Sequence, residues 1–185
     1  DSFFAKSVTG HAQEKEFRVG MIATDISSPY KGFEFFMKGI SHLKKNYGIQ
    51  LKVVLVTNKK VRNYLIPDVD VELTYPKDDE GYLKILDSLS VACVPSSSDN
   101  SPNVIAETLA RGVVVVASNS GGVGEIPSAL GLQTFEYGDL ESFCESMILG
   151  LTRNRLTLEQ QSSLKKMVSE ETHARKLLKI YKSII

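Results

Sequence analysis

The sequence predicts an α/β protein built on a doubly wound, parallel sheet. Short apolar stretches typical of buried strands alternate with segments whose apolar residues recur at helical spacing. Strands and helices that alternate in this way form a parallel sheet with helices on both faces. Ligands bind such sheets at the carboxyl ends of the strands, so a functional site is expected in the loops at that edge.

The first strand and helix are expected between residues 17 and 47. Phe17–Ala23 is a short apolar stretch that predicts a strand, and a turn follows at Ser27–Tyr30. A helix is then predicted by apolar residues at helical spacing, namely Phe36, Ile40, Leu43 and Tyr47.

Further apolar stretches predict the rest of the sheet. Four strands are expected at Leu51–Thr57, Val69–Leu73, Val91–Pro95 and Val113–Ala117, and a weaker one near Leu132–Phe135. Helices are expected over residues 79–89 and over the segment that carries Leu140, Phe143, Met147 and Leu151. Another helical segment is expected from about residue 157 to the end. We therefore divide the chain into a linker or remnant of a preceding domain (1–16), one α/β domain (17–155) and a helical tail (156–185).

Length and composition limit the function classes. The 185 residues suit one domain that folds without disulfide or metal staples, and 42% hydrophobic with 24% charged residues is typical of an ordered globular protein. Lys plus Arg and Asp plus Glu both number 22, so no overall field favours nucleic acid. The lysine pairs also lack the interleaved aromatic residues of a nucleic-acid groove, and we expect no nucleic-acid partner.

The cysteines and the start of the chain indicate the cellular compartment in which the protein is expected to reside. Cys93 lies in an apolar Val-Ala-Cys-Val stretch, which indicates a buried thiol rather than a disulfide or a metal ligand. No apolar run approaches the roughly 20 residues that span a bilayer, and the start lacks a signal-peptide pattern. These features predict cytoplasmic residence. Because Asp1 looks like the product of a cut, the chain is expected to be one part of a longer protein.

The loop after the predicted strand at 91–95 carries the most chemistry. Ser101 is expected to cap the following helix and Pro102 to take its first position, where a missing N–H costs nothing. Free N–H groups near Asn103 and Val104 would then favour an anion such as phosphate. Asp99 lies just before the helix and Glu107 inside it, so the two carboxylates would flank that anion. Carboxylates pair well with sugar hydroxyls. The alternative is a capped structural helix, with Asp99 in a turn and Glu107 solvated.

Two other loops offer weaker signals. Lys31-Gly32 opens the helix after the first strand, where the lysine could reach a bound diphosphate or could simply be solvated. The turn Ser118–Glu125 allows close backbone approach at Gly121 and Gly122, although glycine-rich turns are usually only turns. Tyr75, after the third strand, could form a platform for a nucleotide base or a packed turn.

Some polar residues are interpreted as structural. Asp78, Asp79 and Glu80 are typical of the first turn of a helix, where acids favour the helix dipole. The histidines lie far apart on polar segments without metal-ligand spacing: His11, His42 and His173.

Five segments of the chain agree in order and spacing with a known pattern: Lys31-Gly32, Val91–Ser96, Asp99 with Glu107 eight positions later, Leu109–Ala117 and Gly121–Ile126. Taken together, they resemble the C-terminal domain of the large retaining glycosyltransferase family that contains glycogen synthases, sucrose synthases and bacterial mannosyltransferases. The pair of acids before a Leu-Ala-x-Gly segment is the most specific part, and the resemblance covers about residues 17 to 152.

The resemblance implies a Rossmann-like half of a GT-B fold, with residues 17–155 as the nucleotide-sugar-binding domain. The implied enzyme is a group 1, hexosyltransferase-type glycosyltransferase that acts with retention in polysaccharide or glycoconjugate biosynthesis. The donor would bind between the two halves, and neither a metal nor another cofactor is expected. The N-terminal acceptor domain of the same protein would be the partner, and this chain alone would be inactive. Any peripheral membrane contact would come through that missing domain.

The resemblance also implies residue roles. Glu107 would accept hydrogen bonds from the ribose hydroxyls, Asp99 would hold the transferred sugar, and Lys31 would balance the leaving diphosphate. These three are the expected catalytic residues. The expected donor-binding set adds Gly32, Tyr75, Asn103, Val104, Gly121 and Gly122.

The sequence departs from the family pattern at two positions. The family usually has an arginine where this chain has Asp25, and a glutamate where it has Asp99. The first change replaces a cation with an anion. A degenerate, non-catalytic interaction module with the nucleotide-sugar fold is therefore the alternative hypothesis, and an unrelated doubly wound binding domain is a third.

Overall fold

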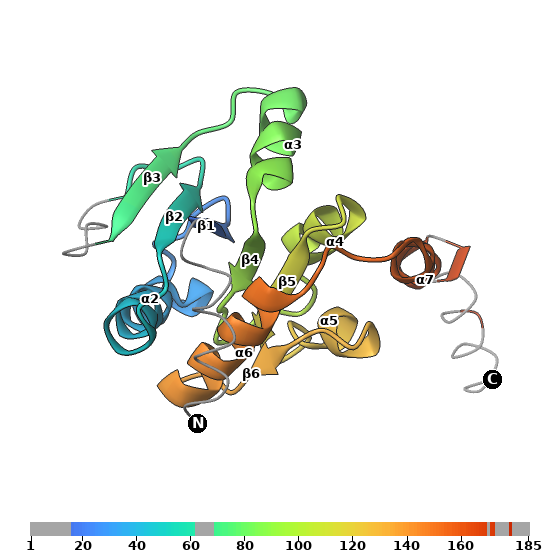
Figure 1. Cartoon of the computed structure of the whole chain (residues 1–185). Helices are drawn as coiled ribbons and strands as arrows, with labels where there is room; N and C mark the ends of the chain where they lie inside the picture. Colours follow the sequence, from blue (N-terminus) through green and yellow to red (C-terminus); the bar gives the residue numbers. More distant parts are fainter. Residues whose placement is uncertain (1–15, 62–68, 170, 173–177, 179–185) are drawn as a thin grey trace.

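The computed structural model describes residues 16–61, 69–169, 171, 172 and 178, and over these ranges helices cover a single sheet (Figure 1). The sheet has six strands in the order β3-β2-β1-β4-β5-β6, and every neighbouring pair is parallel. The strands are β1 (Phe17–Ile22), β2 (Leu51–Val56), β3 (Asp70–Thr74), β4 (Val91–Val94), β5 (Val114–Ser118) and β6 (Thr134–Phe135). The predicted doubly wound parallel sheet is confirmed.

The apolar stretches form strands because the centre of the sheet is covered on both faces. Every residue of β4 and of β5 is buried, so these strands have no polar side to alternate with an apolar one. Most of the predicted strands agree with the structure to within one residue at each end. The predicted strand at Leu132–Phe135 is shorter than expected, since only Thr134 and Phe135 pair with β5.

Helices lie on both faces of the sheet, with α2 and α6 on one face and α3 and α4 on the other (Figure 1). Two glycines allow close packing on the first face. A side chain on Gly39 of α2 would meet the Phe143 ring of α6 at 2.3 Å, and one on Gly150 of α6 would meet Val116 of β5 at 2.5 Å. The helices are α2 (Phe33–Tyr47), α3 (Asp79–Ser88), α4 (Asn103–Ala110), α5 (Glu125–Ala129), α6 (Leu140–Thr152) and α7 (Leu158–Val168). A short 3-10 helix, η1 (Pro29–Lys31), precedes α2.

Polar side chains begin several helices as the sequence pattern suggests. Asp78 caps α3 by accepting a 2.7 Å hydrogen bond from the Gly81 N–H, which confirms that this acid belongs to a helix start. Asp139 caps α6 in the same way, and a capping box at Thr157 begins α7.

The structure differs from the prediction at two helical segments, α5 and the C-terminal tail. Helix α5 was not expected, because five residues that include Pro127 are too short to show a helical period. The predicted final helical segment is interrupted, since α7 ends at Val168 with Ser169 as its cap, and residues 171, 172 and 178 are helical again. Residues 1–15 of the predicted linker (1–16), residue 170 and most of the chain after residue 172 lie outside the described residues.

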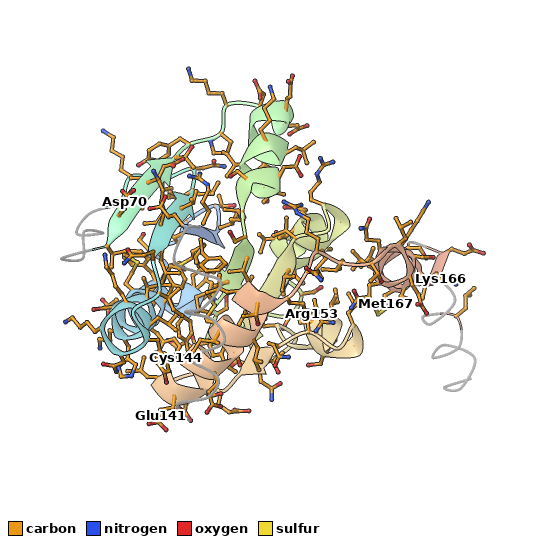
Figure 2. The ribbon with its side chains drawn as sticks, viewed as in Figure 1. Asp70, Glu141, Cys144, Arg153, Lys166 and Met167 are labelled. Atoms are coloured by element: carbon orange, nitrogen blue, oxygen red, sulfur yellow. The ribbon has the colours of Figure 1, made fainter. Side chains whose placement is uncertain are left out.

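The core fills the space between the sheet and its helices. Figure 2 shows Cys144 on α6 within this packed layer, whereas Glu141, at the beginning of the same helix, points outward. Cys93 and Cys144 are both buried free thiols, as predicted for Cys93, and burial raises the pKa of each. Among the described residues, no helix is both long and apolar enough to span a membrane.

Candidate functional site

The site lies where the strand order of the sheet reverses. Strand β1 stands between β2 and β4, so the chain leaves β1 toward one side of the sheet and returns to β4 on the other. The loops that follow β1 and β4 therefore separate at the carboxyl edge and leave a crevice between them.

A cleft of about 780 Å³ occupies this crevice. Its walls come from the loop after β1, the ends of β2 and β3, the first turn of α3, and the loop that leads into α4. Five carboxylates and three lysines line it: Asp25, Asp78, Asp79, Asp99, Glu107, Lys31, Lys59 and Lys77. An acid-rich lining favours hydroxyl donors, so any anion bound here depends on the lysines and on backbone N–H groups.

Helix α4 begins at the cleft, one residue later than predicted. The prediction that Ser101 caps the helix and Pro102 is its first residue is wrong. Pro102 is itself the N-cap, because its backbone is extended at φ −65° and ψ 117°, and it has no side-chain capping bond. The first N–H groups of a helix have no acceptor within the helix. Those of Asn103 and Val104, two residues that line the cleft, are therefore available to a ligand.

The two predicted acids lie on the same cleft. Asp99 precedes α4 and its side chain is 21% exposed, whereas Glu107 lies within α4 and is exposed. Both line the cleft, on either side of the beginning of α4 along the chain. The two acids and the beginning of α4 therefore belong to one cleft, and the roles assigned to the acids remain predictions.

Lys31 reaches the same place from the other loop. Its Nζ lies 2.6 Å from Oδ2 of Asp99, and 5.7 Å from the centre of the Tyr30 ring. Both partners of the ion pair are largely covered, at 25% and 21% exposure of the side chain. An ammonium group has three donors and a carboxylate about four acceptor sites, so each partner keeps groups free for a ligand.

Backbone contacts fix the loop that carries Asp99. The Gly122 N–H donates to the Asp99 carbonyl at 2.9 Å. A side chain on Gly122 would lie 1.6 Å from the Asn100 carbonyl oxygen, and one on Gly121 would lie 2.7 Å from that of Asp99. The glycine-rich turn after β5 therefore supports the Asp99 loop, and neither glycine lines the cleft.

Gly32 supports the other loop. Its backbone is left-handed at φ 73°, and a side chain there would lie 1.8 Å from the Pro95 carbonyl oxygen. The Ser97 N–H also donates to the Tyr30 carbonyl at 2.8 Å, which ties the β4 loop to the β1 loop. Gly32 thus allows the approach of these two loops, and it lines a second, smaller pocket rather than the cleft.

The unexpected acid, Asp25, is held within a local network. It accepts a hydrogen bond from the Ser27 hydroxyl and pairs with Lys59 at 3.1 Å. The Ser27 hydrogen bond and Lys59 lower the pKa of Asp25, so it stays ionised. Lys59 follows β2 and so reaches this edge as any residue after a parallel strand does, but its pairing with Asp25 has no counterpart in the sequence pattern.

Two tyrosines differ from expectation. Tyr75 is 44% exposed and does not line the cleft, although its neighbours Pro76 and Lys77 do. Tyr82, on the first turns of α3, does line the cleft, and its hydroxyl donates to Oε2 of Glu107 at 2.6 Å. The sequence did not single out Tyr82, since only the packing of α3 beside α4 brings the two groups together.

The described residues provide no cluster of three or more His, Cys, Asp or Glu side chains able to hold a metal ion. His42 is on α2, half-buried, and its ring nitrogen contacts the Asn46 side chain. His11 and His173 lie outside the described residues.

A family model matches most of the domain. Residues 16–152 match the family described as glycosyl transferases, group 1. The match includes every strand of the sheet and all the loops of the cleft. A comparison with curated proteins finds no match.

Solved structures share the fold at low sequence identity. A glycosyltransferase from Rickettsia africae is 16% identical with a TM-score of 0.63, covering 99% of this chain and 52% of its own. The trehalose-6-phosphate synthase OtsA is 13% identical with a TM-score of 0.66, covering 100% of this chain and 49% of its own. HepE from Anabaena, solved in complex with UDP and glucose, is 16% identical with a TM-score of 0.64, covering 98% of this chain and 52% of its own. The chain thus spans about half the length of these proteins.

Proposed function

Because the chain belongs to the group 1 glycosyltransferase family, we propose that it is the donor-binding domain of a retaining, hexosyltransferase-type enzyme. The cleft at the carboxyl edge of the sheet would take a nucleotide sugar. The observation that carries the proposal is that the first residues of α4, Asn103 and Val104, line the same cleft as Asp99 and Glu107.

The diphosphate of the donor would lie at the beginning of α4. The N–H groups of Asn103 and Val104 are free of intrahelical acceptors, and the positive end of the helix dipole lies behind them. Lys31 adds a positive charge from the opposite loop. As the glycosidic bond breaks, negative charge grows on the diphosphate, and donors already held in place stabilise it without reorganising.

The two acids would hold the hydroxyl groups on either side of the diphosphate. Glu107 is exposed within the cleft, where it can accept hydrogen bonds from the ribose. Asp99, in the loop before α4, also lines the cleft and can accept hydrogen bonds from hydroxyls of the sugar. Its pair with Lys31 would place the cation next to the leaving group and the anion next to the sugar. No step of this scheme uses a metal ion or another cofactor.

A second domain would complete the enzyme. The chain spans about half the length of the similar glycosyltransferase structures, with 52% of the Rickettsia protein and 49% of OtsA covered. We propose that an N-terminal domain of the same protein binds the acceptor and closes the cleft. The chain alone would then bind a donor with micromolar to millimolar strength, because half of the contacts are missing, and would not transfer the sugar.

Asp25 favours a second candidate function. Asp25, paired with Lys59, lines the same cleft, and its negative charge makes the cleft less favourable for a diphosphate. A degenerate interaction module that keeps the fold without transferring sugar would tolerate this change. In that case the full-length protein would be stable but would show neither transfer nor hydrolysis with any donor.

Calorimetric titration tests the leading proposal. UDP, GDP and ADP are titrated into the chain, together with a Glu107→Ala variant as the matched comparison. We expect at least one nucleotide to bind, and the variant to bind it about tenfold more weakly because a hydrogen bond to a charged group is lost. No binding at millimolar concentration would overturn the proposal. Binding that Glu107→Ala leaves unchanged would place the nucleotide elsewhere.

A further inference from the structure

Tyr82 and Glu107 form a charge-assisted hydrogen bond at the rim of the cleft. The Tyr82 hydroxyl donates to Oε2 of Glu107 at 2.6 Å, a length typical of an O–H donor and an ionised oxygen. The bond joins α3 to α4, and both side chains line the cleft. Glu107 therefore has one oxygen engaged by the protein itself.

The surroundings of Tyr82 keep its hydroxyl protonated, so it remains a hydrogen-bond donor. Its side chain is half-buried, and burial together with the bond to Glu107 raises the pKa of Tyr82 well above its ordinary value. The phenol thus stays protonated throughout the physiological range. Glu107, in contrast, is exposed, and a free glutamate on a helix surface would sample several rotamers. The bond from Tyr82 selects among those rotamers before any ligand arrives.

A fixed carboxylate is suited to a ligand with two adjacent hydroxyl groups. A carboxylate offers about four acceptor sites on its two oxygens, and Tyr82 uses one of them. The remaining sites, chiefly on Oε1, can accept from the vicinal diol of a ribose. A ligand without that diol gains nothing from the orientation of Glu107.

We propose that Tyr82 is a positioning residue, which holds Glu107 so that the cleft prefers ribonucleoside diphosphates over analogues lacking the ribose hydroxyls. The proposal rests on the function proposed above and names a residue outside the predicted site. Preorganisation of this kind strengthens binding because the ordering of the Glu107 side chain does not have to occur on binding.

The test compares two variants with two ligands. Tyr82→Phe removes only the hydroxyl, and Tyr47→Phe, on the C-terminal turn of α2 and outside the cleft, is the matched control. Each is titrated with the tightest of UDP, GDP and ADP and with its 2′,3′-dideoxy counterpart. We expect Tyr82→Phe to weaken the ribonucleotide about fivefold and to leave the dideoxy ligand within about twofold, since only the diol uses Glu107. The control should leave both ligands unchanged.

A double-mutant cycle separates positioning from other effects. In a Glu107→Ala background, Tyr82→Phe should have no further effect on the ribonucleotide, because the group that it positions is gone. Melting temperatures of all variants verify that they are folded.

Three results would overturn the proposal. If Tyr82→Phe weakens both ligands equally, Tyr82 acts on another part of the nucleotide or on the fold. If it keeps the wild-type preference for the ribonucleotide, Tyr82 does not position Glu107, while the proposed function stands. If the wild-type chain binds none of the nucleotides, both the proposed function and this inference are contradicted.

Discussion

The ammonium group of Lys31 lies 2.6 Å from Oδ2 of Asp99, and this ion pair connects the loop after β1 with the loop after β4. The two loops diverge at the reversal of strand order, so the pair bridges the crevice where α/β sheets bind ligands. The partners lie close together although 68 positions separate them in the sequence. The pair therefore places a cation and an anion side by side at the site proposed for the bond that breaks.

Removing the cation of this pair should weaken diphosphate binding. For Lys31→Ala we expect about a tenfold loss of affinity for UDP, GDP or ADP, because a charge-assisted bond is lost and Asp99 is left without its partner. Lys84→Ala, which removes an exposed lysine paired with Glu80 on α3, is the control and should have no effect. Equal affinities for the Lys31→Ala and wild-type chains, by calorimetry, would remove Lys31 from the site.

Removing the anion at position 25 should have the opposite effect. Asp25→Asn deletes a negative charge from the cleft and frees Lys59 from its partner, so diphosphate affinity should rise severalfold. The gain should shrink as salt is added, because Lys59 is exposed to solvent and Asp25 is only partly covered. Asp70→Asn changes the net charge equally but lies at the beginning of β3, outside the cleft, and should not alter affinity. Weaker binding by Asp25→Asn would instead assign Asp25 a favourable contact with the ligand.

The glycine turn after β5 should be intolerant of a methyl group. In Gly122→Ala the new carbon would lie 1.6 Å from the Asn100 carbonyl oxygen, so the Asp99 loop must move. We expect a loss of about 3 kcal/mol in the free energy of unfolding, together with weaker nucleotide binding. Gly131→Ala is the comparison, because Gly131 is left-handed at φ 66° with nothing near it, and should cost about 1 kcal/mol. Urea unfolding that ranks the two variants the other way would contradict the role given to Gly122.

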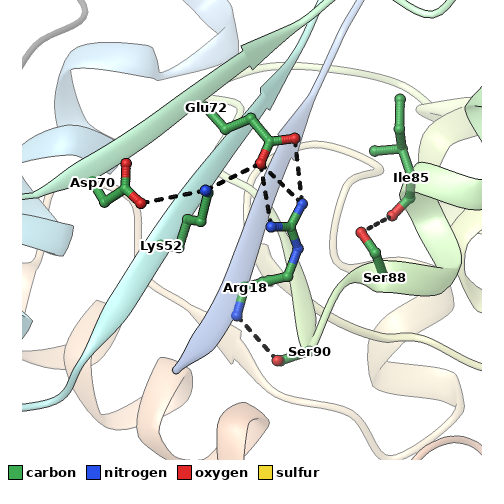
Figure 3. Close-up of polar contacts among 7 residues, drawn as sticks. All are labelled: Arg18, Lys52, Asp70, Glu72, Ile85, Ser88 and Ser90. Atoms are coloured by element: carbon green, nitrogen blue, oxygen red, sulfur yellow. Dashed lines mark hydrogen bonds and ion pairs between the residues drawn. The ribbon is translucent and has the colours of Figure 1, made fainter. Parts of the chain in front are cut away.

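A network of charges on the sheet predicts a pH-dependent stability. Arg18 of β1 donates to both carboxylate oxygens of Glu72 on β3, and Lys52 of β2 pairs with the same side chain (Figure 3). The hydrogen bond from Arg18 is the main cause that lowers the pKa of Glu72. A lowered pKa in the folded state means that the stabilisation is present above the unfolded value of about 4.3 and is lost as the pH falls through the folded value.

Glu72→Gln tests this network. At pH 7 the variant should be less stable than the wild type by no more than about 1 kcal/mol, since 38% of the Glu72 side chain is exposed and solvent screens the pair. The difference should shrink as the pH falls below about 4. Urea unfolding at several pH values measures it. A difference that grows toward low pH would contradict the lowered pKa.

Much of the fold follows from the sequence because the sheet is buried on both faces. Strands such as Val91–Val94 and Val114–Ser118 appear as unbroken apolar stretches, and their ends are visible to within a residue or so. Short elements are harder to predict. Helix α5 has five residues and contains Pro127, so no period can emerge, and the beginning of α4 depends on the backbone of Pro102 rather than on the capping preference of Ser101.

The site is predictable only in part. Lys31, Asp99 and Glu107 could be selected because each lies in a loop, or in the first turns of a helix, that follows a strand at the carboxyl edge of the sheet. The residues that pair with the acids of the cleft, Tyr82 and Lys59, could not be selected in this way. Tyr82 meets Glu107 through the packing of one helix against another, and Lys59 meets Asp25 across the ends of β1 and β2. Pairings of this kind depend on tertiary distances, for which a single sequence carries no pattern.

The most direct test of the proposed function follows the backbone amides of α4 by NMR. A nucleoside diphosphate that binds in calorimetry is titrated into the isotopically labelled chain while the amide resonances of Asn103 and Val104 are recorded. We expect both resonances to shift and to saturate with the calorimetric affinity, because these N–H groups would donate to the phosphate oxygens. Saturable shifts confined to residues outside the cleft, with the two amides unmoved, would contradict the proposed site.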